Sequence, residues 1–209
     1  MYKGDKIMKI SLTNSKLGDK IPSLNLPIEG TCRGDAPCRK SGCYAKKGNW
    51  IYKNVQESLK QNLKEFLTDS DKFFDDIINW INNDDVTYKF FRWFSSGDIV
   101  NYKFLKGMVR VALACPQTKF LCFTKKFNLV NCFLEFGDLP ENLRIVFSGW
   151  DKDFKVDNPF NLPMTYINFK DKSKNAKIDE YAIPCTGSCR TCKACWSLQK
   201  GQSVYFNQH

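Results

Sequence analysis

Seven of the ten cysteines stand in two groups whose spacing suits metal binding. The group near the C-terminus has the spacing C-x3-C-x2-C-x2-C and consists of Cys185, Cys189, Cys192 and Cys195. The group near the N-terminus has the spacing C-x5-C-x4-C and consists of Cys32, Cys38 and Cys43. Thiolates in dense runs of this kind are typical ligands of zinc and of iron–sulfur clusters. We therefore predict that all seven cysteines are metal ligands.

The C-terminal group favours an iron–sulfur cluster over zinc. Structural zinc sites usually use two cysteine pairs separated by about a dozen or more residues, whereas here four cysteines crowd together. Compact runs such as C-x2-C-x2-C-x3-C supply the ligands of four-iron clusters, and the present spacing is close to that run read backwards. A zinc site and an unmetallated tail are the alternatives.

The N-terminal group has only three cysteines, which leaves one iron of a four-iron cluster without a protein thiolate. An open iron can bind a substrate or cofactor directly, which would make this group a catalytic or sensing centre. Alternatively, Cys185 or Cys195 supplies the fourth ligand, as the outlying cysteine does in two-cluster ferredoxins. A single cluster shared by both groups is a further alternative. We therefore expect one or two 4Fe-4S clusters.

The other three cysteines, Cys115, Cys122 and Cys132, lie in apolar segments and are predicted to be core residues, because free cysteine packs as a small hydrophobic side chain. The single histidine, His209, is the last residue and is predicted to be frayed. Its isolation argues against a Ser-His-Asp or Cys-His nucleophile and against the common histidine-based zinc and iron sites. The sequence has no P-loop or dinucleotide-binding glycine pattern.

Length and charge indicate a single basic domain. The 209 residues carry a formal net charge of +10, which suggests an anionic partner such as nucleic acid. The lysines are spread along the chain, however, so a solvated cationic surface is the simpler interpretation. We see no secretory signal and no apolar run of roughly 18 residues, and we therefore expect a cytoplasmic protein without a membrane partner. In that reducing compartment, cysteines are ligands rather than disulfides.

Strands and helices alternate along the sequence. An extended segment over 21–27 leads into the first cysteine loop, and a helix predicted over 44–68 follows the loop. Further helices are predicted over 70–82 (with Ser70 as its cap), 102–114 and 128–136, and further strands over 86–94, 119–124, 143–147, 164–169 and 181–183. This order indicates an α/β fold with a parallel sheet that resembles a partial (βα) barrel. We assign 1–183 to this domain and 184–209 to a cysteine-rich C-terminal tail packed on it.

Functional residues of such sheets gather at the carboxyl ends of the strands. Besides the cysteine loop, that edge is predicted to carry Ser95, Ser96, Asp98, Thr124, Lys125, Ser148, Trp150 and Asp151. Candidates for contacting a polar cofactor there are Ser96, Asp98 and Lys125, together with Arg92. The alternative is that Asp98 caps the next helix and Lys125 is solvated. Trp196, beside a tail cysteine, is predicted to shield a cluster from water.

Several motifs resemble, in order, those of the phage gene-88 protein family. They are Asn14 to Gly18, the loop from Thr31 to Ala45, the Ser96-Gly97-Asp98 element, the strand end Phe123-Thr124-Lys125, and the segment from Cys189 to Trp196. The three-cysteine loop, ending in Cys43-Tyr44 between a strand and a helix, is similar to loops of the radical S-adenosylmethionine enzymes. Those enzymes have a partial (βα) barrel and a cluster with one open iron. The spacing here departs from their usual C-x3-C-x2-C.

Three hypotheses for function follow. The first is a phage-derived iron–sulfur protein that resembles radical S-adenosylmethionine enzymes and acts with a small molecule or redox partner in the host cytoplasm. S-adenosylmethionine is the further cofactor that this resemblance implies. The second is a non-enzymatic iron–sulfur redox or regulatory module that binds nucleic acid or a host protein. The third is a zinc-stabilised binding protein.

Overall fold

The computed structural model describes residues 8–18, 20–40, 42–83, 87–177 and 180–208, so His209, which was predicted to be frayed, lies outside the described residues. The strands are β1 (Ile10–Ser11), β2 (Ser23–Leu24), β3 (Phe90–Trp93), β4 (Lys119–Thr124), β5 (Leu143–Ser148), β6 (Met164–Asn168), β7 (Ile183–Pro184) and β8 (Ser203–Asn207). The α-helices are α1 (Pro37–Lys40), α2 (Lys53–Thr68), α3 (Ser70–Ile81), α4 (Tyr102–Ala114) and α5 (Phe127–Leu134). Short 3-10 helices are η1 (Tyr44–Lys46), η2 (Gly48–Ile51), η3 (Lys172–Lys174) and η4 (Ala194–Trp196).

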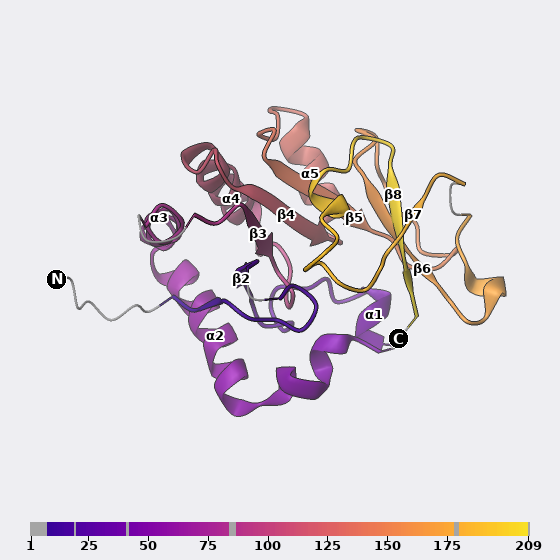
Figure 1. Ribbon diagram of the computed structural model, residues 1–209, viewed down its shortest axis with the longest axis horizontal. Coiled ribbons are helices and arrows are strands. Elements are labelled where there is room, and N and C mark those ends of the chain that lie inside the picture. The colour runs from indigo at the N-terminus through magenta and orange to yellow at the C-terminus, as the bar shows by residue number, and fades with distance from the viewer. Residues whose placement is uncertain (1–7, 19, 41, 84–86, 178–179, 209) are drawn as a thin grey trace.

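The strands form one open sheet in the order β1-β2-β3-β4-β5-β6-β8-β7 (Figure 1). Neighbouring strands are parallel except β1 and β2, which are antiparallel. Helices connect β2 to β3, β3 to β4 and β4 to β5, because parallel neighbours need a crossover connection and cannot be joined by a tight turn. The predicted α/β fold with a partial (βα) barrel-like parallel sheet is confirmed.

The sheet separates two apolar layers, because successive side chains of a strand point to opposite faces. On one face, Phe91, Phe120 and Ile145 join a core to which α2, α3, α4 and α5 all contribute. On the other face, Leu121 and Val146 pack in a smaller core with residues of the C-terminal segment. Figure 1 shows that segment, in gold, in front of the strands, with α5 behind them. The tail therefore covers the sheet face that the helices leave open.

One predicted helix start and one predicted helix cap are wrong for local reasons. The helix predicted over 44–68 begins as two 3-10 turns, and α2 starts only at Lys53. Gly48, the first residue of the second turn, has a φ of 60°, a left-handed conformation that interrupts a helix. The cap of α3 is Asp69 instead of Ser70, and its side chain accepts a hydrogen bond from the backbone N–H of Lys72 at 3.0 Å.

The sequence prediction also missed strands β1 and β8. Strand β8 lies between β6 and β7, so the segment 184–209 carries the cysteines and also supplies a strand within the sheet. Burial of Cys115 and Cys122 is confirmed, but the prediction for Cys132 is wrong because its side chain is exposed. Helix α5 buries Phe127, Val130, Asn131 and Phe133, and Cys132 falls on its outer side. None of the helices in the described ranges has the length and apolar content needed to cross a membrane.

Candidate metal centres

The first cysteine group lies in the loop that leaves β2 at its carboxyl end. The hydroxyl of Thr31 donates to the carbonyl of Pro27, and the N–H of Cys32 donates to the carbonyl of Ile28 at 3.1 Å, so the chain turns directly after the strand. Short helix α1 then carries Cys38, and Cys43 immediately precedes η1. All three thiols are free and partly exposed.

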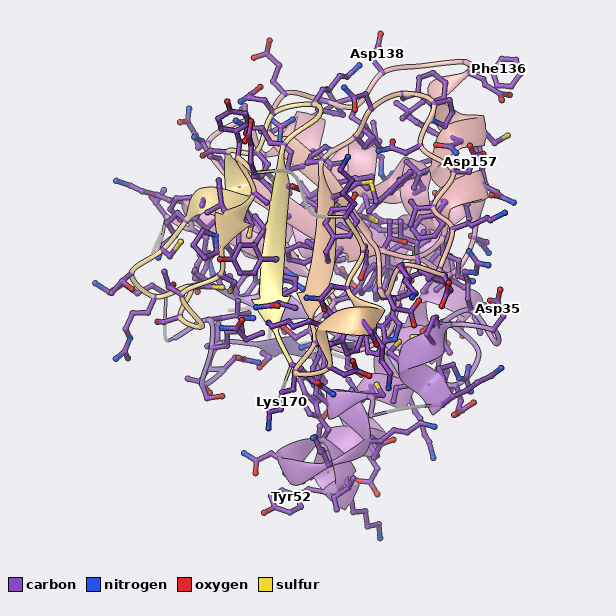
Figure 2. All side chains as sticks on the ribbon, turned by 90° about the vertical axis from the view of Figure 1, so that its right-hand side faces the viewer. Asp35, Tyr52, Phe136, Asp138, Asp157 and Lys170 are labelled. Carbon is purple, nitrogen blue, oxygen red and sulfur yellow. The ribbon has the colours of Figure 1, made fainter. Side chains whose placement is uncertain are left out.

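The three thiols of this loop are close enough to influence one another. Burial, above all, raises the pKa of Cys32 to about 12, and the charges of Asp98, Cys38 and Cys43 raise it further, against a hydrogen bond from Thr31. The outer side of the loop is charged: Asp35 lies on the surface (Figure 2), where it pairs with Arg33. The thiols of the loop thus lie on its inner side, and the salt bridge lies on its outer side.

Asp98 connects the cysteine loop to the end of β4. Its buried carboxylate accepts hydrogen bonds from the hydroxyl of Thr124 at 2.6 Å and from the backbone N–H of Lys125 at 3.0 Å. The N–H of Asp98 donates to the hydroxyl of Thr31 at 3.1 Å. Burial raises the pKa of Asp98, although these hydrogen bonds oppose the rise. Asp98 does not cap α4, because the cap residue of that helix is Asn101.

Lys125 and Ser96 also have partners within the protein. The ammonium of Lys125 donates to the hydroxyl of Ser148 at 2.6 Å and lies 5.8 Å from the ring centre of Trp150. Burial raises the pKa of Cys38, and the charge of Lys125 lowers it, which places this cation beside the first cysteine group. The hydroxyl of Ser96 donates to the carbonyl of Leu26 at 3.0 Å. The structure thus brings Ser96, Asp98 and Lys125 to the edge that carries the loop, and cofactor binding by them stays a prediction.

The tail cysteines are fixed by backbone contacts to distant parts of the chain. The N–H of Cys185 donates to the carbonyl of Tyr205 at 2.9 Å, and the N–H of Cys189 donates to the carbonyl of Lys16 at 2.8 Å. Burial raises the pKa of Cys195 to about 12, and the other three tail thiols raise it further. The four thiols of the tail therefore form one group, and Cys185, Cys189 and Cys195 pack against the apolar layer on the sheet face opposite the helices.

Trp196 anchors the tail on β3. Its ring is only 4% exposed and packs edge-on against Phe90 at 5.6 Å between ring centres. Its indole N–H donates to the carbonyl of Phe91 at 3.2 Å. Lys193 folds back over the same turn and donates to the carbonyl of Cys189. Trp196, which docks the tail on the sheet, thus directly follows Cys195 in the sequence.

The donor set of both groups fits an iron–sulfur cluster. The two groups supply seven free thiols and no histidine, and thiolates are the soft ligands that such clusters use. Among the described residues, no three cysteine, histidine, aspartate or glutamate side chains converge as the ligands of one metal ion do. Nearby cations, Lys125 in one group and Arg92 in the other, suit anionic thiolates.

A cavity of about 530 Å³ lies away from both cysteine groups, at the beginnings of β6 and β8. The side chains that line it include Asn161, Met164, Tyr166 and Ser203. The hydroxyl of Ser203 is buried without a hydrogen-bond partner among the described residues. The cavity shares no residue with the predicted site, because its residues belong to the opposite edge of the sheet from the first cysteine loop.

Comparison with known proteins identifies a family. The protein family described as Gene product 88 matches residues 3–198, a range that contains both cysteine groups. The predicted relationship to the phage gene-88 family is confirmed by this match. No curated protein matches the chain, and no solved structure matches it. The similarity of the first loop to radical S-adenosylmethionine enzymes stays a prediction.

Proposed function

We propose that this chain, which belongs to the Gene product 88 family, is an iron–sulfur protein whose two cysteine groups each hold a four-iron cluster. The observation that carries the proposal is the folding back of the tail. It places four mutually interacting thiols on the open face of the same sheet whose edge carries the three-thiol loop. Thiolates gathered in this way in one small fold are the ligand set that iron–sulfur clusters use.

In the first group, Cys32, Cys38 and Cys43 would hold three irons. When bound, such a cluster supplies one-electron chemistry and, at the iron without a thiolate, a position for a small ligand. Burial raises the pKa of Cys38, and the charge of Lys125 opposes that rise. Because the loop is similar to those of radical S-adenosylmethionine enzymes, S-adenosylmethionine is the ligand we propose for the open position.

In the tail group, Cys185, Cys189, Cys192 and Cys195 would hold the second cluster, with all four irons bound by protein. Trp196 closes one side of this group, since its ring is buried against β3. Exclusion of water from a cluster shifts its reduction potential, so this packing has a functional consequence beyond stability. A cluster without an open iron is suited to electron transfer and not to ligand binding.

Two triple variants test cluster binding. In protein purified without oxygen, replacing Cys32, Cys38 and Cys43 by alanine should remove about half of the iron and sulfide, and replacing Cys189, Cys192 and Cys195 should remove the other half. The exposed Cys132→Ala is the matched control and should retain all of both. Zinc in place of iron, or iron that survives both triple variants, would overturn the proposal. Loss of all iron in each triple variant would mean that the two cysteine groups share a single cluster.

A separate assay tests the proposed ligand. The reduced, cluster-loaded protein is incubated with S-adenosylmethionine, and 5′-deoxyadenosine is measured together with the electron paramagnetic resonance spectrum of the cluster. We expect product or a changed spectrum that requires Cys32, Cys38 and Cys43. The absence of both, in protein with full iron content, would refute S-adenosylmethionine as the ligand and leave cluster binding intact.

A further inference from the structure

We infer that the exposed segment between the first cysteine loop and α2 is a binding site for single-stranded nucleic acid. The segment consists of η1, η2 and the residues around them. Its exposed side chains, which we call the 44–53 surface, are Tyr44, Lys46, Lys47, Ile51, Tyr52 and Lys53. The inference does not rest on the proposed function, because none of these six side chains is a candidate metal ligand.

Large apolar side chains lie uncovered on the 44–53 surface. Tyr44 is 51% exposed, Ile51 is 61% exposed and Tyr52 is 57% exposed. None of the three belongs to either apolar core of the described chain. Figure 2 shows Tyr52 at the lower end of the molecule, on the helical segment that projects there. Single exposed apolar residues are ordinary, but three within nine consecutive positions indicate a surface that contacts a partner.

The aromatic rings of this segment are held in place. The hydroxyl of Tyr44 donates to the carbonyl of Ser95, and its ring packs edge-on against Trp50 at 6.4 Å between ring centres. The carbonyl of Trp50 accepts a hydrogen bond from the side-chain amide of Gln56 at 2.6 Å, which ties η2 to α2. A ring that is fixed and still half exposed offers a base a stacking platform with little loss of conformational freedom.

Cations accompany these rings. Residues 36–56 contain five lysine or arginine residues and no aspartate or glutamate. Lys46 and Lys47 are both exposed between the two turns. The side chain of Lys53 is 92% exposed, and its ammonium lies 3.9 Å from the exposed carboxylate of Glu57, an ion pair that contributes little in water. The 44–53 surface is therefore positively charged and complementary to an anionic partner.

Single-stranded nucleic acid combines the two features that this surface would recognise. Its phosphates pair with lysines, and its unpaired bases stack on exposed rings, whereas a duplex keeps its bases stacked on one another. An anionic membrane would require a continuous apolar face to enter the lipid, but Lys46 and Lys47 separate Tyr44 from Ile51. Because every base has a face that stacks, we expect binding with little preference for sequence.

The experiment titrates fluorescently labelled oligo(dT) and oligo(U), each of about 12 nucleotides, with the full-length protein and follows anisotropy at several salt concentrations. Tyr52→Ala should weaken binding roughly 5- to 150-fold, the effect of one lost stacked base, and leave the salt dependence unchanged. Tyr52→Phe keeps the ring and should restore the affinity. The double variant Lys46→Gln, Lys47→Gln should lower the slope of log affinity against log salt by about 1.4, because each phosphate contact of a single strand contributes about 0.7.

Two matched controls lie elsewhere on the molecule. Phe136→Ala removes an aromatic side chain that is 82% exposed at the opposite end from Tyr52 (Figure 2). The double variant Lys103→Gln, Lys106→Gln removes two exposed cations from α4. Both controls should bind as wild type does, since neither changes the 44–53 surface.

Four outcomes would overturn the inference. They are no binding of either oligonucleotide by wild type, tighter binding of a duplex of the same length, equal effects of the test and control variants, and binding only to vesicles of phosphatidylglycerol and phosphatidylcholine. Different affinities for oligo(dT) and oligo(U) would identify DNA or RNA as the preferred strand and support the inference. If Tyr52→Ala does not fold, the lysine double variant and its salt dependence decide. Iron content is measured in the same samples, so failure to bind nucleic acid and failure to hold clusters are separate results.

Discussion

Truncation of Trp196 should release the tail from the sheet, and the burial of its side chain gives the size of the expected loss in stability. A buried aromatic side chain removes about 150–250 Å² from water, which at about 25 cal/mol per Å² corresponds to roughly 4–6 kcal/mol as an upper limit. Trp196 is only 4% exposed and also donates its indole N–H to Phe91, a hydrogen bond that contributes about 1 kcal/mol. We therefore expect Trp196→Ala to lower the free energy of unfolding by about 3–5 kcal/mol.

The assay is urea unfolding of the reduced, metal-free protein, followed by far-ultraviolet circular dichroism. Trp196→Phe keeps most of the ring but loses the donor, and should cost about 1–2 kcal/mol. The matched control is Phe136→Ala, because Phe136 is 82% exposed and its truncation should change the stability by less than about 0.5 kcal/mol. If Trp196→Ala lowers the free energy of unfolding by no more than Phe136→Ala does, the tail is not a structural layer of the fold. The placement of its cysteines is then refuted.

Three further predictions concern the cysteine loop and its surroundings. Cys38→Ala should lose bound iron that Cys132→Ala retains, and equal loss in both would contradict the division between ligand and non-ligand cysteines. In the metal-free protein, the pKa of Cys32 is about 12 instead of the ordinary 9.0, so its alkylation at pH 8 should be roughly a thousandfold slower than that of an ordinary exposed thiol. That rate should rise about tenfold per pH unit up to about pH 12, and a rate equal to that of exposed Cys132 would refute the burial of Cys32. Gly97→Ala should destabilise the protein by about 1–3 kcal/mol, because Gly97 has a φ of 85° and a Cβ there would lie 2.7 Å from the carbonyl oxygen of Leu26. Gly34→Ala meets nothing within 4 Å and should be nearly neutral in the same unfolding measurement.

Much of the fold was predictable because its central elements are long and strongly patterned. Helix α4 and strand β4 begin and end where the apolar pattern predicts, and the parallel order follows from their alternation. Strand β1 has only two residues and offers no period to detect. Strand β8 is specified by its pairing with β6 and β7, which is a property of the folded chain and not of residues 203–207 alone.

The candidate site was also predictable only in part. Spacing identifies the seven cysteines, and the rule for parallel sheets places Asp98 and Lys125 beside the first loop, where the structure has them. The docking of the tail depends on contacts between Cys189 and Lys16 and between Trp196 and β3, more than 100 residues apart in the sequence.

The most direct test of the account is the content of iron, zinc and acid-labile sulfide per chain in protein purified without oxygen. Two four-iron clusters predict about eight irons and eight sulfides per chain, with no stoichiometric zinc. About one or two zinc ions per chain without sulfide would contradict the account, and would leave a structural metal site in a protein without cluster chemistry.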